Sequence, residues 1–71
     1  MEKLHAYLLA LPAGQRDQFA VRCGTTVGYL FKAISIGQRL GITLAARIER
    51  ESNGAVSREE VRPDIDWKLL A

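Results

Sequence analysis

Apolar residues recur at helical spacing along most of the chain. Near the start, Leu4, Leu8 and Leu11 are separated by four and then three residues, which places them on one face of a helix. This spacing predicts a first helix over residues 2–11. Residues 12–14, Pro-Ala-Gly, then interrupt the pattern and predict a turn.

Residues 15–35 predict two short helices joined by a tight turn. In the first of them, over residues 15–23, Ala20 stands four residues before Gly24. A small residue lets two helices cross closely, and glycine readily adopts the left-handed backbone of a sharp turn. The spacing is typical of a helix-turn-helix whose recognition helix spans residues 26–35. Two packed helices of an ordinary small bundle are the alternative interpretation.

The predicted recognition helix has an apolar face and an open face. At about 100° per residue, Val27, Leu30 and Ile34 fall together and are expected to point inward. The Thr-Thr sequence at its start offers a hydroxyl to cap the first backbone N–H groups. The outward residues are the candidates for reading DNA bases in the major groove: Thr26, Gly28, Tyr29, Phe31 and Lys32.

Each outward residue has a chemical role open to it. Lys32 can donate to guanine O6 and N7 or to a phosphate, and Thr26 can touch a base or a phosphate. Gly28 has no side chain, so the helix backbone can lie close to the groove floor. Tyr29 can donate to a phosphate or pack on a thymine methyl group. Phe31 can meet a thymine methyl group, although its position favours a place in the core.

Flanking segments supply candidates for contacts with the DNA backbone. The N-terminal end of the first helix of the pair and the loop after the recognition helix both approach phosphates in such complexes. The candidates are Gln15, Arg16, Thr25, Gln38 and Arg39. Arg16 and Arg22 are expected to point outward, where a solvated helix face is an equally good explanation for both.

A loop over residues 36–43 is expected to lead into the next helix, with Thr43 as its cap. Arg47 and Glu51 are four residues apart, so we expect a surface ion pair between them. Residues 52–54, Ser-Asn-Gly, end this helix with a glycine just past the last turn.

A last short helix and a tail follow. Ser57 and Glu60 have the spacing of a capping box, and Pro63 is expected to stop the helix that they begin. The tail over residues 64–71 turns from polar to apolar and can cover its own domain or contact a second subunit. Its apolar residues are Ile65, Trp67, Leu69 and Leu70.

Composition narrows the class of protein. Seventy-one residues make a single domain over 1–71. The lone cysteine, Cys23, excludes an internal disulfide, is expected to pack as a small hydrophobe, and fits a cytoplasmic setting. We expect no metal site, cofactor, small-molecule substrate or catalysis, because the lone histidine, His5, has no nucleophile or ligand cluster near it. We also expect no signal peptide and no membrane span.

The charges are unevenly distributed along the chain, although the net charge is only +2. Between residues 15 and 50 there are six basic and two acidic residues, whereas three basic and five acidic residues follow. The basic part contains the predicted recognition helix, where phosphate contacts are needed. The distribution therefore supports a nucleic-acid partner.

The segments CGTTVGYL and RIERESNGAVSREEVRPD resemble the YdaS family of small prophage helix-turn-helix regulators, a branch of the Cro-like repressors. The resemblance covers nearly the whole chain. It implies an all-α, five-helix, lambda-repressor-like domain, and the helix signals between Thr43 and Glu60 agree. The family's base-reading positions are matched here by Thr26, Val27, Gly28, Phe31 and Lys32. We leave Val27 out because helical spacing places it inside.

Two functions from different classes follow. The first is a sequence-specific regulator, a Cro-type repressor of prophage or toxin–antitoxin genes. It binds a double-stranded operator as a homodimer, with half-sites about one helical turn apart. The second is a helical protein-interaction module, an antitoxin that holds a protein partner through its apolar tail. The operator and the regulated genes are not written in this sequence.

Overall fold

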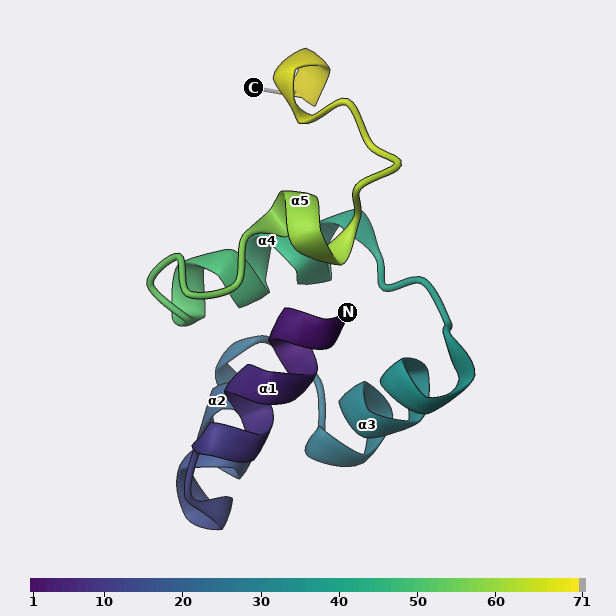
Figure 1. Cartoon of the computed structure of the whole chain (residues 1–71). Helices are drawn as coiled ribbons and strands as arrows, with labels where there is room; N and C mark the ends of the chain where they lie inside the picture. Colours follow the sequence, from purple (N-terminus) through teal and green to yellow (C-terminus); the bar gives the residue numbers. More distant parts are fainter. Residues whose placement is uncertain (71) are drawn as a thin grey trace.

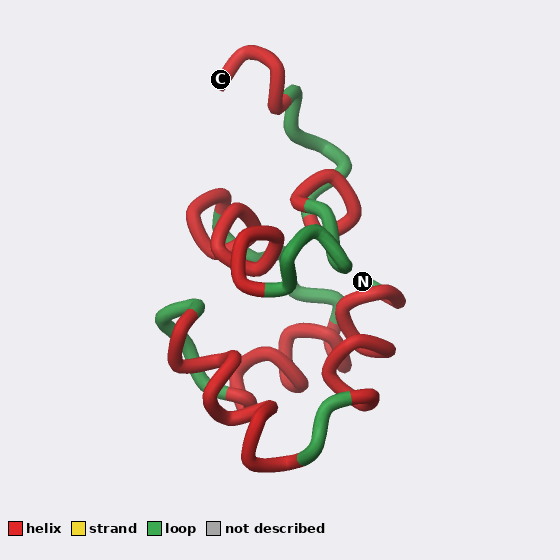
Figure 2. Tube along the Cα trace, turned by 90° about the vertical axis from the view of Figure 1, so that its left-hand side faces the viewer, coloured by secondary structure: helices red, strands yellow, loops and turns green. Residues whose placement is uncertain are grey.

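A computed structural model describes residues 1–70, and all regular structure in this range is helical. This confirms the predicted all-α fold with five α-helices. Figure 1 shows the order along the chain, and the tube view in Figure 2 shows the same helices from the side. The elements are α1 (Glu2–Ala10), α2 (Ala13–Arg22), α3 (Val27–Ile36), α4 (Ile42–Glu51), α5 (Arg58–Val61) and a C-terminal 3₁₀ turn, η1 (Trp67–Leu70).

The helices divide into a lower and an upper group in Figure 1. Helix α1 lies beside α2, and α3 extends away from them after the turn that follows α2. Helices α4 and α5 pack together above α1, and η1 stands at the end of the molecule farthest from the α1–α2 connection. The C-terminal turn and α3 are therefore separate features on the surface.

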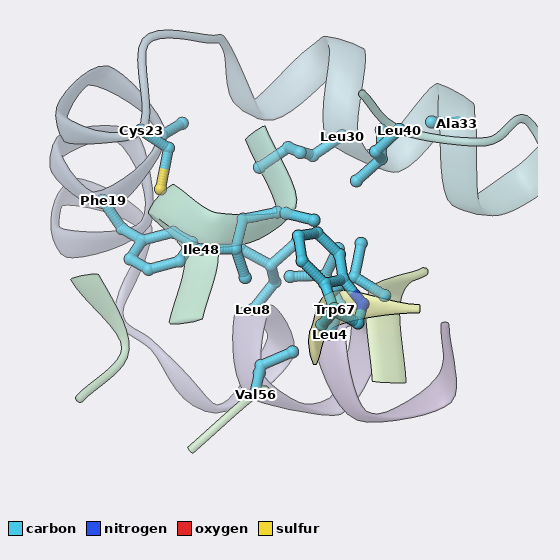
Figure 3. Packing of buried hydrophobic residues seen from close by; sticks show 13 residues of the cluster. Leu4, Leu8, Phe19, Cys23, Leu30, Ala33, Leu40, Ile48, Val56 and Trp67 are labelled. Atoms are coloured by element: carbon cyan, nitrogen blue, oxygen red, sulfur yellow. The ribbon is translucent and has the colours of Figure 1, made fainter. Parts of the chain in front are cut away.

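The core is assembled from every α-helix and from three connecting segments, which contribute Cys23, Leu40 and Val56 (Figure 3). The side chains of Leu4, Leu8, Phe19, Leu30 and Ile48 are fully buried, as their helical spacing predicts. Removing such side chains from water is the main force that holds a domain of this size together.

The turn between α2 and α3 has the geometry that the glycine position predicts. Gly24 has φ of +81°, and the N–H of Thr25 donates to the carbonyl of Ala20 at 2.9 Å. This closes the end of α2 in a Schellman motif. Thr26 then caps α3, since its Oγ1 accepts from the N–H of Tyr29 at 3.1 Å. The helix-turn-helix over residues 15–35 is thus formed, with α3 beginning at Val27.

Helix α2 begins earlier than predicted. Residues 12–14 do not form a separate turn, because Pro12 is the N-cap and residues 13 and 14 are helical. Pro12 has an extended ψ of 149° and lacks an N–H, so it can stand directly before the first helical residue, and Gly14 is open to solvent in the first turn. The proline therefore starts α2 instead of separating it from α1 by a longer connection.

The boundaries of the loop after α3 also differ from the prediction. Ile36 still belongs to α3, and α4 begins at Ile42 with Gly41 as its N-cap. The prediction that Thr43 caps α4 is wrong, because the backbone is already helical there. Leu40 in this loop is fully buried, which holds the connection against the core.

The predicted ion pair between Arg47 and Glu51 is not formed. The Nη1 of Arg47 donates to the carbonyl of Cys23 at 3.5 Å, and Glu51 pairs with Arg22 at 3.1 Å and Arg50 at 3.0 Å. These pairs hold the pKa of Glu51 below its usual value, with the hydrogen bond from Arg50 as the largest cause. Tertiary contacts between α2 and α4 thus replace the pairing within α4.

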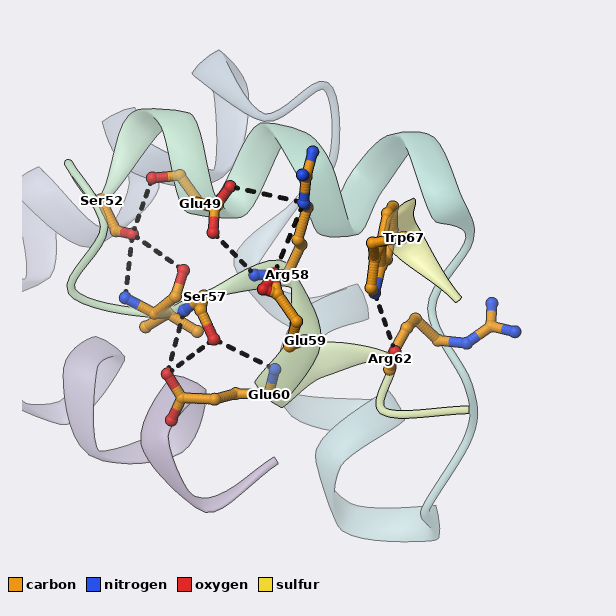
Figure 4. A network of polar contacts seen from close by, with 9 residues as sticks. Glu49, Ser52, Ser57, Arg58, Glu59, Glu60, Arg62 and Trp67 are labelled. Carbon is orange, nitrogen blue, oxygen red and sulfur yellow. Dashed lines mark hydrogen bonds and ion pairs between the residues drawn. The ribbon is translucent and has the colours of Figure 1, made fainter. Parts of the chain in front are cut away.

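The turn after α4 and the capping box follow the sequence signals (Figure 4). Ser52 is buried, and its Oγ accepts from the N–H of Val56 at 3.1 Å. The Oγ of Ser57 accepts from the N–H of Glu60 at 3.2 Å, and a Glu60 carboxylate oxygen accepts from the N–H of Ser57 at 3.1 Å. The bond from the N–H of Ser57 is the largest cause that lowers the pKa of Glu60, and the Oγ of Ser57 also donates to this carboxylate at 2.9 Å. Together they fix α5 although it has only four residues.

None of the helices in residues 1–70 is long and apolar enough to cross a membrane. Within the same residues, no group of His, Cys, Asp and Glu side chains is placed to hold a metal ion.

Candidate nucleic-acid interface

Helix α3 has one buried face and one open face, as its residue pattern predicts. Leu30 and Ala33 are fully buried, and Val27 and Ile34 are half-buried against the core. Gly28 and Lys32 are exposed on the opposite side, together with Thr26 and Tyr29 at its edges. A Cβ on Gly28 would meet nothing within 4 Å, so nothing in the fold itself requires glycine there.

The hydroxyl group of Thr26 caps α3 as an acceptor, which leaves its proton available to donate. Its oxygen accepts from the N–H of Tyr29. A hydroxyl group also carries one proton to donate, and the side chain is exposed. Thr26 can therefore cap the helix and donate to an acceptor outside the protein at the same time.

Phe31 is half-buried and packs between α1 and α2. The ring of His5 meets it edge-on, with the ring centroids 5.9 Å apart. The guanidinium of Arg16 lies over the Phe31 ring, 5.7 Å from its centroid. These contacts favour the interpretation that Phe31 belongs to the packing, as its position in the sequence also favours.

Arg16 does not point outward as predicted. Its Nε donates to the carbonyl of Leu8 at 2.8 Å, and its Nη2 donates to the carbonyl of Leu11 at 3.0 Å. The last carbonyl groups of a helix lack partners within the helix, and a guanidinium satisfies them well. Arg16 thereby joins the C-terminal end of α1 to the first turn of α2. Arg22 is exposed as predicted and pairs with Glu51.

Gln15 and Thr25 lie at the two ends of α2. Gln15 is exposed in the first turn, where no side chain caps the free N–H groups. Thr25 is half-buried and follows the turn glycine. The exposed first turn of α2 offers partial positive charge at its backbone N–H groups.

The end of α3 is joined to the loop that follows it. Gly37 takes the left-handed conformation with φ of +69°, and the N–H of Gln38 donates to the carbonyl of Ala33 at 2.9 Å. The Nε2 of Gln38 also donates to the Oη of Tyr29 at 3.2 Å. One candidate base-reading residue and one candidate phosphate residue are thus in direct contact.

Arg39 extends from this loop and is 76% exposed at its side chain. Its Nη1 lies 3.5 Å from Oδ2 of Asp64, which follows α5. Asp64 also accepts from Arg62, and this hydrogen bond is the largest cause that lowers the pKa of Asp64 to about 2. The carboxylate is therefore charged at neutral pH.

Cys23 is the C-cap of α2 within the helix-turn-helix and is buried. Burial raises the pKa of its thiol to about 11, which keeps the thiol protonated at neutral pH. This agrees with the expectation that Cys23 packs as a small hydrophobe.

The tail divides into a buried and an exposed part. Trp67 is only 7% exposed; its Nε1 donates to the carbonyl of Arg62 at 3.0 Å, and the guanidinium of Arg58 lies 5.2 Å from its ring centroid (Figure 4). Ile65 is half-buried against the core, whereas Leu69 and Leu70 are 80% and 57% exposed. Residue 71 lies outside the described residues.

Sequence reasoning missed three residues that shape this surface. Leu40 was an isolated apolar residue in a predicted loop, and only its burial shows that it anchors the loop. Arg62 and Asp64 flank Pro63. Their opposite charges, two residues apart, are the one local signal that could have predicted their ion pair. Their contacts with the α3–α4 loop depend on tertiary structure.

The fold and this surface together are those of a small helix-turn-helix domain in which one face of α3 is open. The chain is 31% identical over 62 residues to a protein of Escherichia coli (strain K12) described as a prophage transcriptional regulatory protein. The match covers 87% of this chain and 94% of that protein. The chain therefore belongs to the family of prophage transcriptional regulators. No family model and no solved structure matches it.

Proposed function

We propose that this protein is a sequence-specific regulator that binds double-stranded DNA with α3 in the major groove. The observation that carries the proposal is the open face of α3, where Gly28 and Lys32 lie opposite the buried Leu30 and Ala33. A helix presented in this way by a preceding helix and a tight turn fits the major groove. Membership of a prophage regulator family supports the same conclusion.

The proposed base-reading face consists of four exposed residues and one half-buried residue. Lys32 donates to guanine or to a phosphate, and Thr26 donates near the start of the helix. Gly28 allows close approach of the backbone, and Tyr29 contributes its hydroxyl or its ring edge. Phe31 contributes mainly by holding α3 against α1 and α2.

The proposed phosphate contacts lie on both sides of this face. Gln15 and Thr25 are at the ends of α2, and Gln38 and Arg39 are in the loop after α3. Arg39 is the most exposed cation of this set and supplies the largest electrostatic contribution. Arg16 is expected to act mainly on the fold, because two of its nitrogens already bond the end of α1.

We further propose a homodimer on a two-fold operator, with the exposed Leu69 and Leu70 as the contact between subunits. Two adjacent exposed leucines beside a buried tryptophan form an apolar end that water solvates poorly. Pairing two copies would bury these leucines and present two recognition helices to half-sites about one helical turn apart.

A titration with labelled DNA from upstream of the protein's own gene tests the proposal. We expect tight binding that survives excess unrelated duplex and weakens as salt increases, because phosphate contacts release counterions. Lys32→Ala should reduce the preference for this DNA, whereas the matched control Lys68→Ala, on η1, should retain it. Binding that unrelated duplex removes completely would contradict a sequence-specific regulator.

The second candidate function, an antitoxin that binds a protein, also rests on Leu69 and Leu70. In that case the protein would form a stoichiometric complex with the product of a neighbouring gene and show no salt-dependent DNA binding. Leu69→Ser with Leu70→Ser should then abolish the complex and leave the helical content unchanged.

A further inference from the structure

The loop that carries Gln38 and Arg39 is held in place by the segment after α5. The Nη1 of Arg62 donates to the carbonyl of Leu40 at 2.8 Å, and the Nε1 of Trp67 donates to the carbonyl of Arg62 at 3.0 Å. Leu40 and Trp67 are both buried, so these bonds lie at the edge of the core. The segment from Arg62 to Trp67 therefore fixes the position of the loop relative to α3.

Asp64 in this segment is fixed by Arg62. The Nε and Nη2 of Arg62 donate to the two carboxylate oxygens of Asp64, both at 2.9 Å. Such a two-pronged pair defines both the place and the orientation of a carboxylate. The Arg62 side chain is 15% exposed, so this arginine has little freedom to leave.

Arg39 also approaches this carboxylate. Its Nη1 lies 3.5 Å from the Oδ2 of Asp64, and its side chain reaches far into solvent. The Asp64 carboxylate thus pairs with two arginines, of which Arg62 is held in place and Arg39 is free to move. Arg62 is anchored by its bond to Leu40, whereas Arg39 has a single, longer contact that it can give up.

We propose that Asp64 competes with DNA phosphate for Arg39 and so restrains the affinity of the DNA-binding face. This inference rests on the proposed function. When Arg39 moves to a phosphate, Asp64 remains paired with Arg62, so the exchange leaves no carboxylate without a partner.

The variant Asp64→Asn tests the competition directly. It removes the charge and keeps an oxygen that accepts from Arg62. At low salt we expect it to bind both upstream DNA and unrelated duplex about two- to five-fold more tightly, the range that an exposed ion pair provides. The gain should shrink as salt increases.

Asp66→Asn is the matched control. It makes the same change of charge two residues away, on a side chain that accepts from the N–H of Lys68 and has no pair with Arg39. We expect its gain in affinity to be at least two-fold smaller. Equal gains for the two variants would show an effect of net charge alone and overturn the proposal.

A double-mutant cycle with Arg39→Gln isolates the competition. In that background we expect Asp64→Asn to give no more gain than Asp66→Asn. An undiminished gain would overturn the proposal while leaving DNA binding established. Failure of the unsubstituted protein to bind any duplex would overturn the proposed function as well. Should Asp64→Asn melt below the assay temperature, Asp64→Ser, which also removes the charge, carries the same prediction.

Discussion

Arg16 donates from its Nε to the carbonyl of Leu8, 2.8 Å away, across the connection between α1 and α2. The same guanidinium donates to the carbonyl of Leu11 and lies over the ring of Phe31. One side chain of α2 therefore contacts both the end of α1 and α3. The position of Arg16 made it a candidate phosphate contact, whereas these contacts give it a role in holding the fold together.

Arg16→Ala should destabilise the protein by about 1–3 kcal/mol, because it leaves carbonyl groups at the end of α1 without their charged donor. Chemical denaturation measures this directly. Arg16→Lys retains the charge and loses the two-pronged geometry, so it should recover only part of the loss. The salt dependence of DNA binding should change little in either variant. A reduced salt slope with unchanged stability would instead make Arg16 a phosphate contact.

Gly28→Ala should raise the stability of the protein and weaken its binding to DNA. Alanine favours a helix interior by roughly 0.5–1 kcal/mol over glycine, and the added Cβ meets nothing within the protein. We therefore expect a higher midpoint of thermal unfolding together with weaker binding to the operator. Gly28→Leu should weaken binding further while the fold is retained. Unchanged operator affinity in both variants would exclude close approach at this position.

Cys23 should make the protein sensitive to alkaline pH. The pKa of its thiol is raised from 9.0 in the unfolded chain to about 11 in the fold, mainly by burial. Its contribution to the free energy of unfolding is therefore complete below about pH 9 and is lost as pH increases toward 11. Denaturation of the unsubstituted protein and of Cys23→Ala across this range measures it. The difference between the two should narrow toward pH 11, and a constant difference would contradict the account.

The two parts of the tail should respond differently to substitution. Trp67→Ala should cost about 3–5 kcal/mol, because it opens a cavity and leaves the carbonyl of Arg62 without its donor. The double variant Leu69→Ala, Leu70→Ala should keep the fold of the single chain and weaken the proposed dimer. Sedimentation velocity over a range of concentrations measures the association. Identical sedimentation of this variant and the unsubstituted protein would exclude these leucines as the dimer contact.

Much of the fold could be predicted from local signals in the sequence. The positions of Leu4, Leu8, Phe19 and Leu30 at helical spacing predict the buried faces, and Gly24 predicts the turn. These features depend on the periodicity of a helix and on the one residue type that readily adopts positive φ. Signals of this kind act over a few residues, so a single sequence contains them.

The mispredicted side-chain contacts of Arg16 and Arg47 involve partners on other helices. Arg47 has a suitable partner four residues away, yet it lies against Cys23 while Glu51 pairs with Arg22. Arg16 has the pattern of a solvated residue, yet the end of α1 provides acceptors that only the fold brings near. Long cationic side chains select among several acceptors within reach, and periodicity along one helix does not rank them. The open face of α3 was predictable, whereas the groups that surround it were not.

The most direct test of the proposed base-reading face compares affinities of the unsubstituted protein and Lys32→Ala for operator and for unrelated duplex at the same salt concentration. If Lys32 contacts a base, the ratio of the two affinities should fall about five- to hundred-fold, the equivalent of one specific contact. Lys68→Ala should leave the ratio unchanged. If Lys32→Ala weakens both affinities equally, Lys32 contacts phosphate only. If it weakens neither, α3 does not bind DNA through this face.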